Sequence, residues 1–198
     1  MDGTIPLWLK IAYGLFTPVL IAIYWPRYGP ANFLWLSDIA LFLTTGALLL
    51  EWPLLIAMAA VGVLALEVFW SVDFILLGRF GLTSYMFDGK WPRWLRAISL
   101  FHLALAPTWL WALWRFGYDP MAFPLQLLLT WAVQLACYRF TDPEKNINWV
   151  FGPGEKPQHR LPPRLYLAIV MALIPLLVIT PTHFLLLWLF GDGGIWRR

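Results

Sequence analysis

The chain has 198 residues, of which 61% are hydrophobic and only 13% are charged. An average soluble domain has about 45–50% apolar and about 25% charged residues, so this composition excludes an ordinary soluble protein. The formal net charge of +3 is spread over short connections, and no basic patch is interleaved with exposed aromatic residues, which argues against a nucleic-acid partner. We therefore expect an integral membrane protein whose main partner is the lipid bilayer.

Six apolar runs are each long enough to cross a bilayer, whose core needs about 20 helical residues. Turn residues at 117–120 separate the fourth run from the fifth, and residues 51–53 predict a tight hairpin between the second and third. The last run contains Pro175 and Pro181, which predict a kink or tilt. The expected architecture is one all-α domain over residues 1–198, a bundle of six transmembrane helices near 5–25, 31–50, 52–77, 95–114, 121–139 and 164–190.

Lysine and arginine residues divide unevenly between the two ends of the expected bundle. The first, third and fifth connections and their flanks carry ten of them: Arg27, Arg79, Lys90, Arg93, Arg96, Arg139, Lys145, Lys156, Arg160 and Arg164. The opposite side carries three: Arg115, Arg197 and Arg198. Basic residues favour the cytoplasmic side, so this asymmetry predicts that both termini are extracytoplasmic and that the two longest loops are cytoplasmic.

Ionisable residues inside the expected spans are the candidate site. A charged side chain near the bilayer centre costs about 2.5–3.5 kcal/mol, so it normally faces a partner or a water-filled cavity. At about 1.5 Å of rise per residue, four such residues fall in the cytoplasmic half of the membrane: Asp38, Glu67, Asp73 and His102. Glu67 and Asp73 are six residues apart, about 120° around a helix, so they do not form a carboxylate pair on one face.

We expect His102 to lie within hydrogen-bonding reach of Glu67 or Asp38. A carboxylate–imidazole pair there can act as a general base or a proton relay. The alternative is that these side chains only hold the helices together. We expect no metal site, because the chain has no His-x-x-x-His or Glu-x-x-His pair. One histidine with carboxylates leaves iron or magnesium as an alternative, and the sequence does not identify which cofactor, if any, the protein binds.

The connection at residues 141–157 is too rich in Trp, Val and Phe for a flexible linker. Asp142-Pro143 and Gly152-Pro153-Gly154 predict a turn at each end. We interpret the segment as a folded loop between the fifth and sixth helices that covers the cytoplasmic mouth of the site, where loops often carry function. The alternative is a loop anchored on the membrane surface by Trp149 and Phe151.

The segments 141–163 and 29–38 resemble those of a set of bacterial multi-pass inner-membrane proteins that have no assigned function. The resemblance extends over nearly the full length of the chain. It implies a location in the bacterial inner (plasma) membrane, and it carries over no catalytic residue.

These observations leave three hypotheses for the function. The first is an intramembrane enzyme acting on a lipid or isoprenoid-like substrate, with His102 and Glu67 or Asp38 as acid–base groups and Asp73 as a further candidate. The second is a small proton-coupled transporter in which the same residues form the relay, working as a homo-oligomer because the chain is short. The third is a structural or assembly subunit of a larger membrane complex.

Overall fold

The structure, a computed structural model, describes residues 5–154 and 156–196. It is 75% helical, and the described residues contain no strand. The helices are α1 (Leu7–Tyr28), α2 (Leu36–Leu50), α3 (Pro53–Ile75), α4 (Arg93–Ile98), α5 (Phe101–Phe116), α6 (Ala122–Phe140), α7 (Pro163–Ile174) and α8 (Thr180–Phe190). Short 3₁₀ turns lie at Pro30–Leu34, Ser84–Met86, Pro143–Lys145 and Ile147–Trp149. The predicted all-α class is therefore confirmed.

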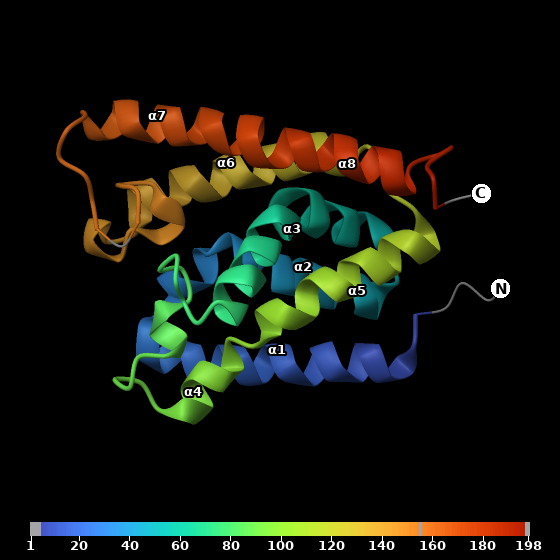
Figure 1. Cartoon of the computed structure of the whole chain (residues 1–198), viewed down its shortest axis with the longest axis horizontal. Coiled ribbons are helices and arrows are strands. Elements are labelled where there is room, and N and C mark those ends of the chain that lie inside the picture. The colour runs from blue at the N-terminus through green and yellow to red at the C-terminus, as the bar shows by residue number, and fades with distance from the viewer. Residues whose placement is uncertain (1–4, 155, 197–198) are drawn as a thin grey trace.

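Helix α3 lies at the centre of the molecule and contacts α2, α5, α6 and α8. In Figure 1 it lies between α1 at one edge and α7–α8 at the other. Its small residues explain this position, because they let neighbouring backbones approach closely. Ala59 and Ala60 are fully buried, and a Cβ added to Gly62 would collide with the Gln126 side chain of α6.

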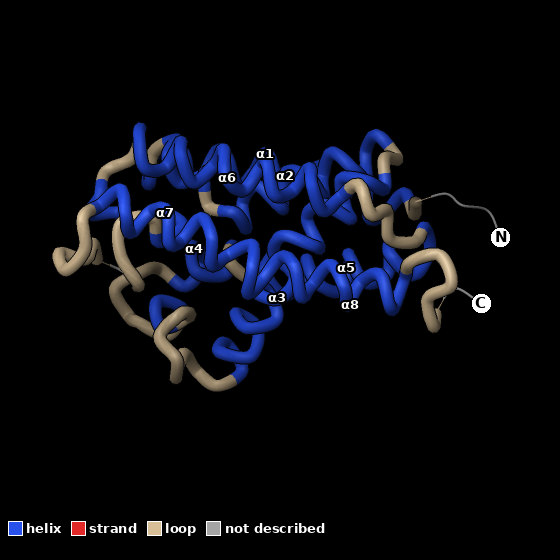
Figure 2. The backbone as a smooth tube through the Cα atoms, turned by 90° about the horizontal axis from the view of Figure 1, so that it is seen from above, coloured by secondary structure: helices blue, strands red, loops and turns tan. Residues whose placement is uncertain are grey.

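The connections gather at the two ends of the helices (Figure 2). One end holds the longer connections at residues 29–35, 76–92 and 141–162, whereas the other holds the short ones and both termini of the described chain (Figure 1). The α2–α3 hairpin turns at Glu51, which has a left-handed φ of 54°. The ammonium group of Lys10 in α1 forms an ion pair with the Glu51 carboxylate, which ties the start of α1 to this turn.

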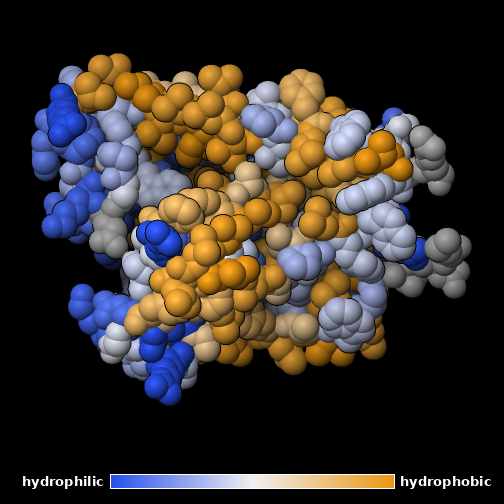
Figure 3. Space-filling model, viewed as in Figure 1, coloured by the Kyte–Doolittle hydropathy of each residue, from blue (hydrophilic) through white to orange (hydrophobic). Residues whose placement is uncertain are grey.

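The outer surface is apolar along the length of the helices. Leu15, Leu128, Leu177 and Phe184 are each more than 60% exposed. Figure 3 shows this apolar surface across the middle of the molecule, with hydrophilic residues concentrated at the end that holds the longer connections. Such a surface suits lipid contact rather than water.

Four helical segments of the described chain are long and apolar enough to cross a membrane: Leu7–Tyr28, Pro53–Ile75, Arg93–Phe116 and Pro163–Phe190. The other two predicted spans contain α2 and α6. Helix α2 has 15 residues, about 22 Å at 1.5 Å per residue, so it is short for a core of about 30 Å. Helix α6 carries Gln126 and Gln134, which lower its hydropathy. The described chain thus has four candidate membrane-spanning helices, and the six-span arrangement stays a prediction.

The prolines of the last segment change its hydrogen bonding without ending the helix. Pro175 has no N–H, so the carbonyl of Met171, four residues earlier, lacks its usual helical donor. The indole N–H of Trp131 on α6 donates to this carbonyl at 2.8 Å. A π-helical turn at Pro175–Ile179 follows and joins α7 to α8. A bond from another helix therefore compensates for the proline.

Candidate functional site

A cavity of about 890 Å³ lies at the end of the bundle that holds the longer connections. Its wall includes residues of α1, α2, α3, α4 and α5, the 80–85 connection and the 145–154 segment. The polar side chains that line it are Tyr24, Tyr28, Asn32, Ser37, Asp38, Glu67, Ser84, Tyr85, Arg96, Ser99, His102, Lys145, Asn146 and Asn148. Four tryptophans also line it: Trp35, Trp70, Trp91 and Trp149. The cavity is thus both aromatic and rich in groups that can hydrogen bond.

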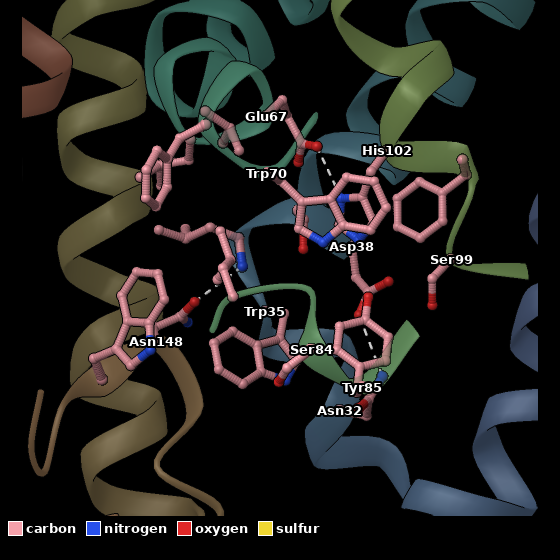
Figure 4. A pocket seen from close by; sticks show the side chains of 18 of the residues that line it. Asn32, Trp35, Asp38, Glu67, Trp70, Ser84, Tyr85, Ser99, His102 and Asn148 are labelled. Carbon is pink, nitrogen blue, oxygen red and sulfur yellow. Dashed lines mark hydrogen bonds and ion pairs between the residues drawn. The ribbon is translucent and has the colours of Figure 1, made fainter. Parts of the chain in front are cut away.

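Glu67 and His102 form the central contact of this cavity. His102 Nδ1 lies 2.8 Å from Glu67 Oε2, and only 2% of the Glu67 side chain and 13% of the His102 side chain are exposed. If Glu67 is ionised, its carboxylate can only accept a hydrogen bond, and Nδ1 is then the donor of this pair. Figure 4 shows the two side chains converging from α3 and α5. The expected carboxylate–imidazole contact is therefore present.

Two aromatic rings hold the imidazole of His102 from its faces. The Trp70 ring centroid lies 4.5 Å from that of the imidazole at an interplanar angle of 22°, and the Phe101 centroid lies 4.2 Å away at 26°. The stack continues from Trp70 to Phe74 at 5.4 Å. A ring held on two faces and at Nδ1 has little freedom to rotate. The described part of the chain provides no hydrogen bond to the second ring nitrogen, Nε2.

Asp38 lies in the first turn of α2 and lines the same cavity. It is 4% exposed, and Asn32 Nδ2 donates to its Oδ2 at 3.3 Å. Figure 4 shows both side chains within the pocket. Among the described residues no hydrogen bond or ion pair joins Asp38 to His102, so the imidazole has one carboxylate partner there, Glu67. Asp38 provides a second acid in the same space.

Asp73, the remaining candidate, is occupied elsewhere. Its carboxylate accepts the backbone N–H of Phe80 at 2.6 Å and of Thr83 at 2.7 Å, and the Thr83 hydroxyl at 2.9 Å. Asp73 does not belong to the cavity wall described above. Its position on α3, about 120° around the helix from Glu67, points it at the connection that follows α3. Asp73 therefore holds the connection that follows α3 in place, and it does not contact His102.

Several polar residues of the cavity are not selected by the sequence reasoning above: Tyr24, Asn32, Tyr85 and Arg96. The Tyr24 hydroxyl lies 3.1 Å from the Ser99 hydroxyl, where α4 and α5 meet. Burial raises the pKa of Tyr85, so its hydroxyl stays protonated near neutral pH. A polar residue within an apolar run gives a weak signal for Tyr24 and Ser99. Tyr85 gives no such signal, because the sequence of its connection is that of an ordinary loop.

Two asparagines organise the 141–157 segment beside the cavity. The Asn146 amide donates to the carbonyls of Gly152 and Gly154, at 2.7 Å and 2.8 Å. Asn148 accepts the Leu36 N–H at 3.0 Å and donates to the Leu34 carbonyl at 2.7 Å. Both asparagines have a left-handed φ, of 40° and 53°, which asparagine tolerates better than most residues. These bonds fold the segment and attach it to the start of α2.

The remaining histidine inside a predicted span lies away from the cavity. His183 on α8 contacts the Tyr118 hydroxyl through Nδ1 at 2.7 Å, near the end of the bundle that holds the short connections. Within residues 5–154 and 156–196, no group of three His, Cys, Asp or Glu side chains is placed to hold a metal ion. We assign no metal ligand among these residues.

The comparisons with known proteins leave the site to be interpreted from its geometry. No protein-family model, no curated protein and no solved structure matches this chain. The resemblance to bacterial inner-membrane proteins therefore stays a prediction.

Proposed function

We propose that the chain is an intramembrane enzyme that acts on a lipid or isoprenoid-like substrate, with His102 as the acid–base residue and Glu67 as the residue that orients it. The observation that carries this proposal is the 2.8 Å contact between His102 Nδ1 and Glu67 Oε2 in the wall of a cavity of about 890 Å³. Structural pairing alone does not need a cavity beside the pair. A cavity also weighs against a purely structural assembly subunit.

The geometry supports a distinct part for each residue in proton transfer. Glu67 accepts a hydrogen bond from Nδ1–H and so keeps the proton on Nδ1. The lone pair of Nε2 is then available to a substrate hydroxyl or a water molecule. A carboxylate that holds a histidine in one tautomer is how hydrolytic triads orient their base. Asp38 is the second acid, and Tyr85 is a neutral donor in the same wall. The arrangement supports removal of a proton from a hydroxyl and its later return to a leaving group.

The cavity suits an amphiphile in both size and lining. Small-molecule sites occupy about 300–1,000 Å³ and are mostly apolar, with a few polar groups. Its wall also reaches residues at the outer surface of the helices, where Phe69 is 46% exposed and Phe80 is 61% exposed. Ile174 adds a residue from the end of α7. A substrate tail can therefore approach from the lipid side while the reacting group of the substrate reaches His102.

We further propose that the protein has six spans in a bacterial inner membrane, that both termini are extracytoplasmic, and that the cavity opens toward the cytoplasm. The ten-to-three distribution of lysine and arginine supports this orientation. The hydrophilic end in Figure 3, next to the cavity, supports it as well. In this orientation the folded 141–157 segment lies over the cytoplasmic mouth.

A proton-coupled carrier is the second candidate, and one observation favours it. Gln126, Thr130 and Gln134 form a buried row along α6, one helical turn apart. Neither amide atom of Gln134 has a hydrogen-bond partner in the described structure. A buried polar row of this kind can hold water and conduct protons. Proton uptake by vesicles containing the protein, abolished by Gln134→Leu, would favour the carrier.

Lipid turnover tests the enzyme directly. The protein is placed in nanodiscs made from bacterial polar lipids with an added long-chain polyprenyl phosphate, and products are identified by mass spectrometry. We expect a new lipid species whose rate of formation falls about 100-fold or more in His102→Gln and Glu67→Gln. Glu144→Gln, an exposed carboxylate outside the cavity, is the matched control. No product, or equal rates in all four proteins, contradicts the proposal.

A further inference from the structure

A smaller cavity of about 260 Å³ adjoins the large one and is lined by Arg27, Tyr28, Asn32 and Lys145. Tyr28, Asn32 and Lys145 also line the large cavity. The two spaces therefore share a wall at the end of α1, and we name the smaller one the vestibule. Asn32 connects the vestibule with the site, because its amide donates to Asp38.

The vestibule is lined by two cationic side chains that have unused N–H donors. Arg27 Nη1 donates to the Ile23 carbonyl at 3.1 Å, and its guanidinium lies 4.9 Å from the centroid of the Trp94 ring. Lys145 Nζ donates to the Tyr28 carbonyl at 3.2 Å. Arginine has five N–H donors and lysine has three, so most of their donors remain available. Neither cation forms an ion pair with a carboxylate of residues 5–154 or 156–196.

A third cation, Arg96, lines the large cavity. It donates through Nη1 to the Met86 carbonyl, and its buried Nε has no hydrogen-bond partner in the described structure. A buried donor without an acceptor is costly, so it favours an anion or other acceptor nearby. Asp38 and Glu67, in the same wall, oppose a negative charge close to His102. The two carboxylates therefore make the surroundings of the imidazole less favourable for an anionic group than the vestibule, which has two cations and no carboxylate in its lining.

We propose that the vestibule binds the phosphate group of an amphiphile whose remaining part extends into the large cavity. This inference rests on the proposed function and names its substrate class. A phosphate monoester carries about −1.5 to −2 charges at pH 7, which two cations neutralise. Arginine binds phosphate oxygens through its planar fork and lysine binds them as a point charge, while the Asn32 amide adds a neutral donor.

A binding assay with defined probes tests this subsite. Dihexanoyl phosphatidic acid, dihexanoylglycerol and inorganic phosphate are each titrated into the full chain in neutral maltoside micelles. Intrinsic fluorescence reports binding, because Trp35, Trp91 and Trp149 line the large cavity. We expect saturable binding of the phosphatidic acid, with an affinity at least about tenfold higher than that of either other probe.

Matched variants assign the binding to the vestibule. Arg27→Gln/Lys145→Gln should weaken phosphatidic acid binding at least about tenfold, whereas Arg79→Gln/Arg160→Gln removes the same charge from exposed positions outside both cavities and should change it less than about twofold. The charge-preserving Arg27→Lys should retain binding. Equal weakening in both double variants, or equal affinity for dihexanoylglycerol, overturns the phosphate subsite. Equal affinity for inorganic phosphate overturns the headgroup assignment in favour of free phosphate.

His102→Gln separates this proposal from the proposed function. This variant should bind phosphatidic acid as tightly as the unmodified protein while losing lipid turnover. Retained binding without any turnover in the unmodified protein would overturn the enzyme and leave the phosphate subsite standing.

Discussion

Glu67 and His102 are 35 positions apart in the sequence, yet Glu67 Oε2 and His102 Nδ1 lie 2.8 Å apart between α3 and α5. Trp70, one turn after Glu67 on α3, stacks on the same imidazole. Helix α3 therefore supplies both the carboxylate that holds the ring and one of the two rings that flank it. The central helix of the fold thereby positions the candidate acid–base residue.

Replacing Glu67 distinguishes a functional pair from a structural one. Glu67→Gln keeps the size of the side chain and an acceptor for Nδ1, so we expect a folded protein. It removes the negative charge that stabilises the protonated imidazole during proton transfer, so we expect no activity. Glu67→Leu leaves the largely buried imidazole without its partner, at a cost of about 1–3 kcal/mol. Thermal unfolding in detergent, followed by tryptophan fluorescence, measures the stability of both variants. If Glu67→Gln retains full turnover, Glu67 serves only to hold the helices together.

Asp73 should matter for folding and not for turnover. Asp73→Ala removes the acceptor of two backbone N–H groups and one hydroxyl, so we expect a loss of about 1–3 kcal/mol in stability. Activity per folded molecule should be unchanged, because Asp73 is outside the cavity wall. Asp88→Ala, in an exposed connection, is the control. A stable Asp73→Ala protein with no turnover would show that Asp73 takes part in the reaction.

Asn148 should hold the 141–157 segment against α2 and α6. Its amide also donates to the Sγ atom of Cys137, which is fully buried and is the single cysteine of the chain. Asn148→Ala leaves the Leu36 N–H unpaired and places alanine at a left-handed φ, so the segment should open more often. The expected result is faster maleimide labelling of Cys137 than in the unmodified protein. Labelling as slow as in the Glu144→Ala control would show that the segment does not depend on Asn148.

The Trp131–Met171 bond should compensate for Pro175. Trp131→Phe removes the donor to the Met171 carbonyl and should cost about 0.5–1.5 kcal/mol. In a Pro175→Ala background the helix regains its own N–H donor at position 175, so the same replacement should cost less. Thermal unfolding of the four proteins in this double-mutant cycle measures the difference. Equal costs in both backgrounds would mean that the indole bond does not replace the missing helical one.

The proposed orientation can be tested by thiol labelling in whole cells. In a Cys137→Ser background, an impermeant reagent should label Ile195→Cys, at an exposed position, and miss Lys156→Cys, because positive charge concentrates on the side of Lys156. Labelling after cell lysis controls for accessibility of each thiol. The reverse pattern would place the cavity mouth on the extracytoplasmic side.

The helical runs and the contact at His102 were accessible to sequence reasoning for one physical reason. Buried charges are so costly in lipid that their depth along each helix restricts their partners, which placed Glu67 and His102 at a common level. Depth alone placed Asp73 only in the cytoplasmic half of the membrane, and its hydrogen-bond partners lie in a connection that folds back onto α3. The cavity contacts of Tyr85 and the vestibule depend likewise on how connections pack. The hydrophobic periodicity of the sequence gives no information on that packing.

The tautomer of His102 tests the central claim most directly. Nitrogen-15 NMR of histidine-labelled protein, assigned with His102→Gln, distinguishes a protonated from an unprotonated ring nitrogen. We predict a proton on Nδ1, the atom that contacts Glu67, and an unprotonated Nε2 in the neutral ring. A neutral His102 that carries its proton on Nε2 would contradict the account, because no lone pair would then remain there to accept a substrate proton.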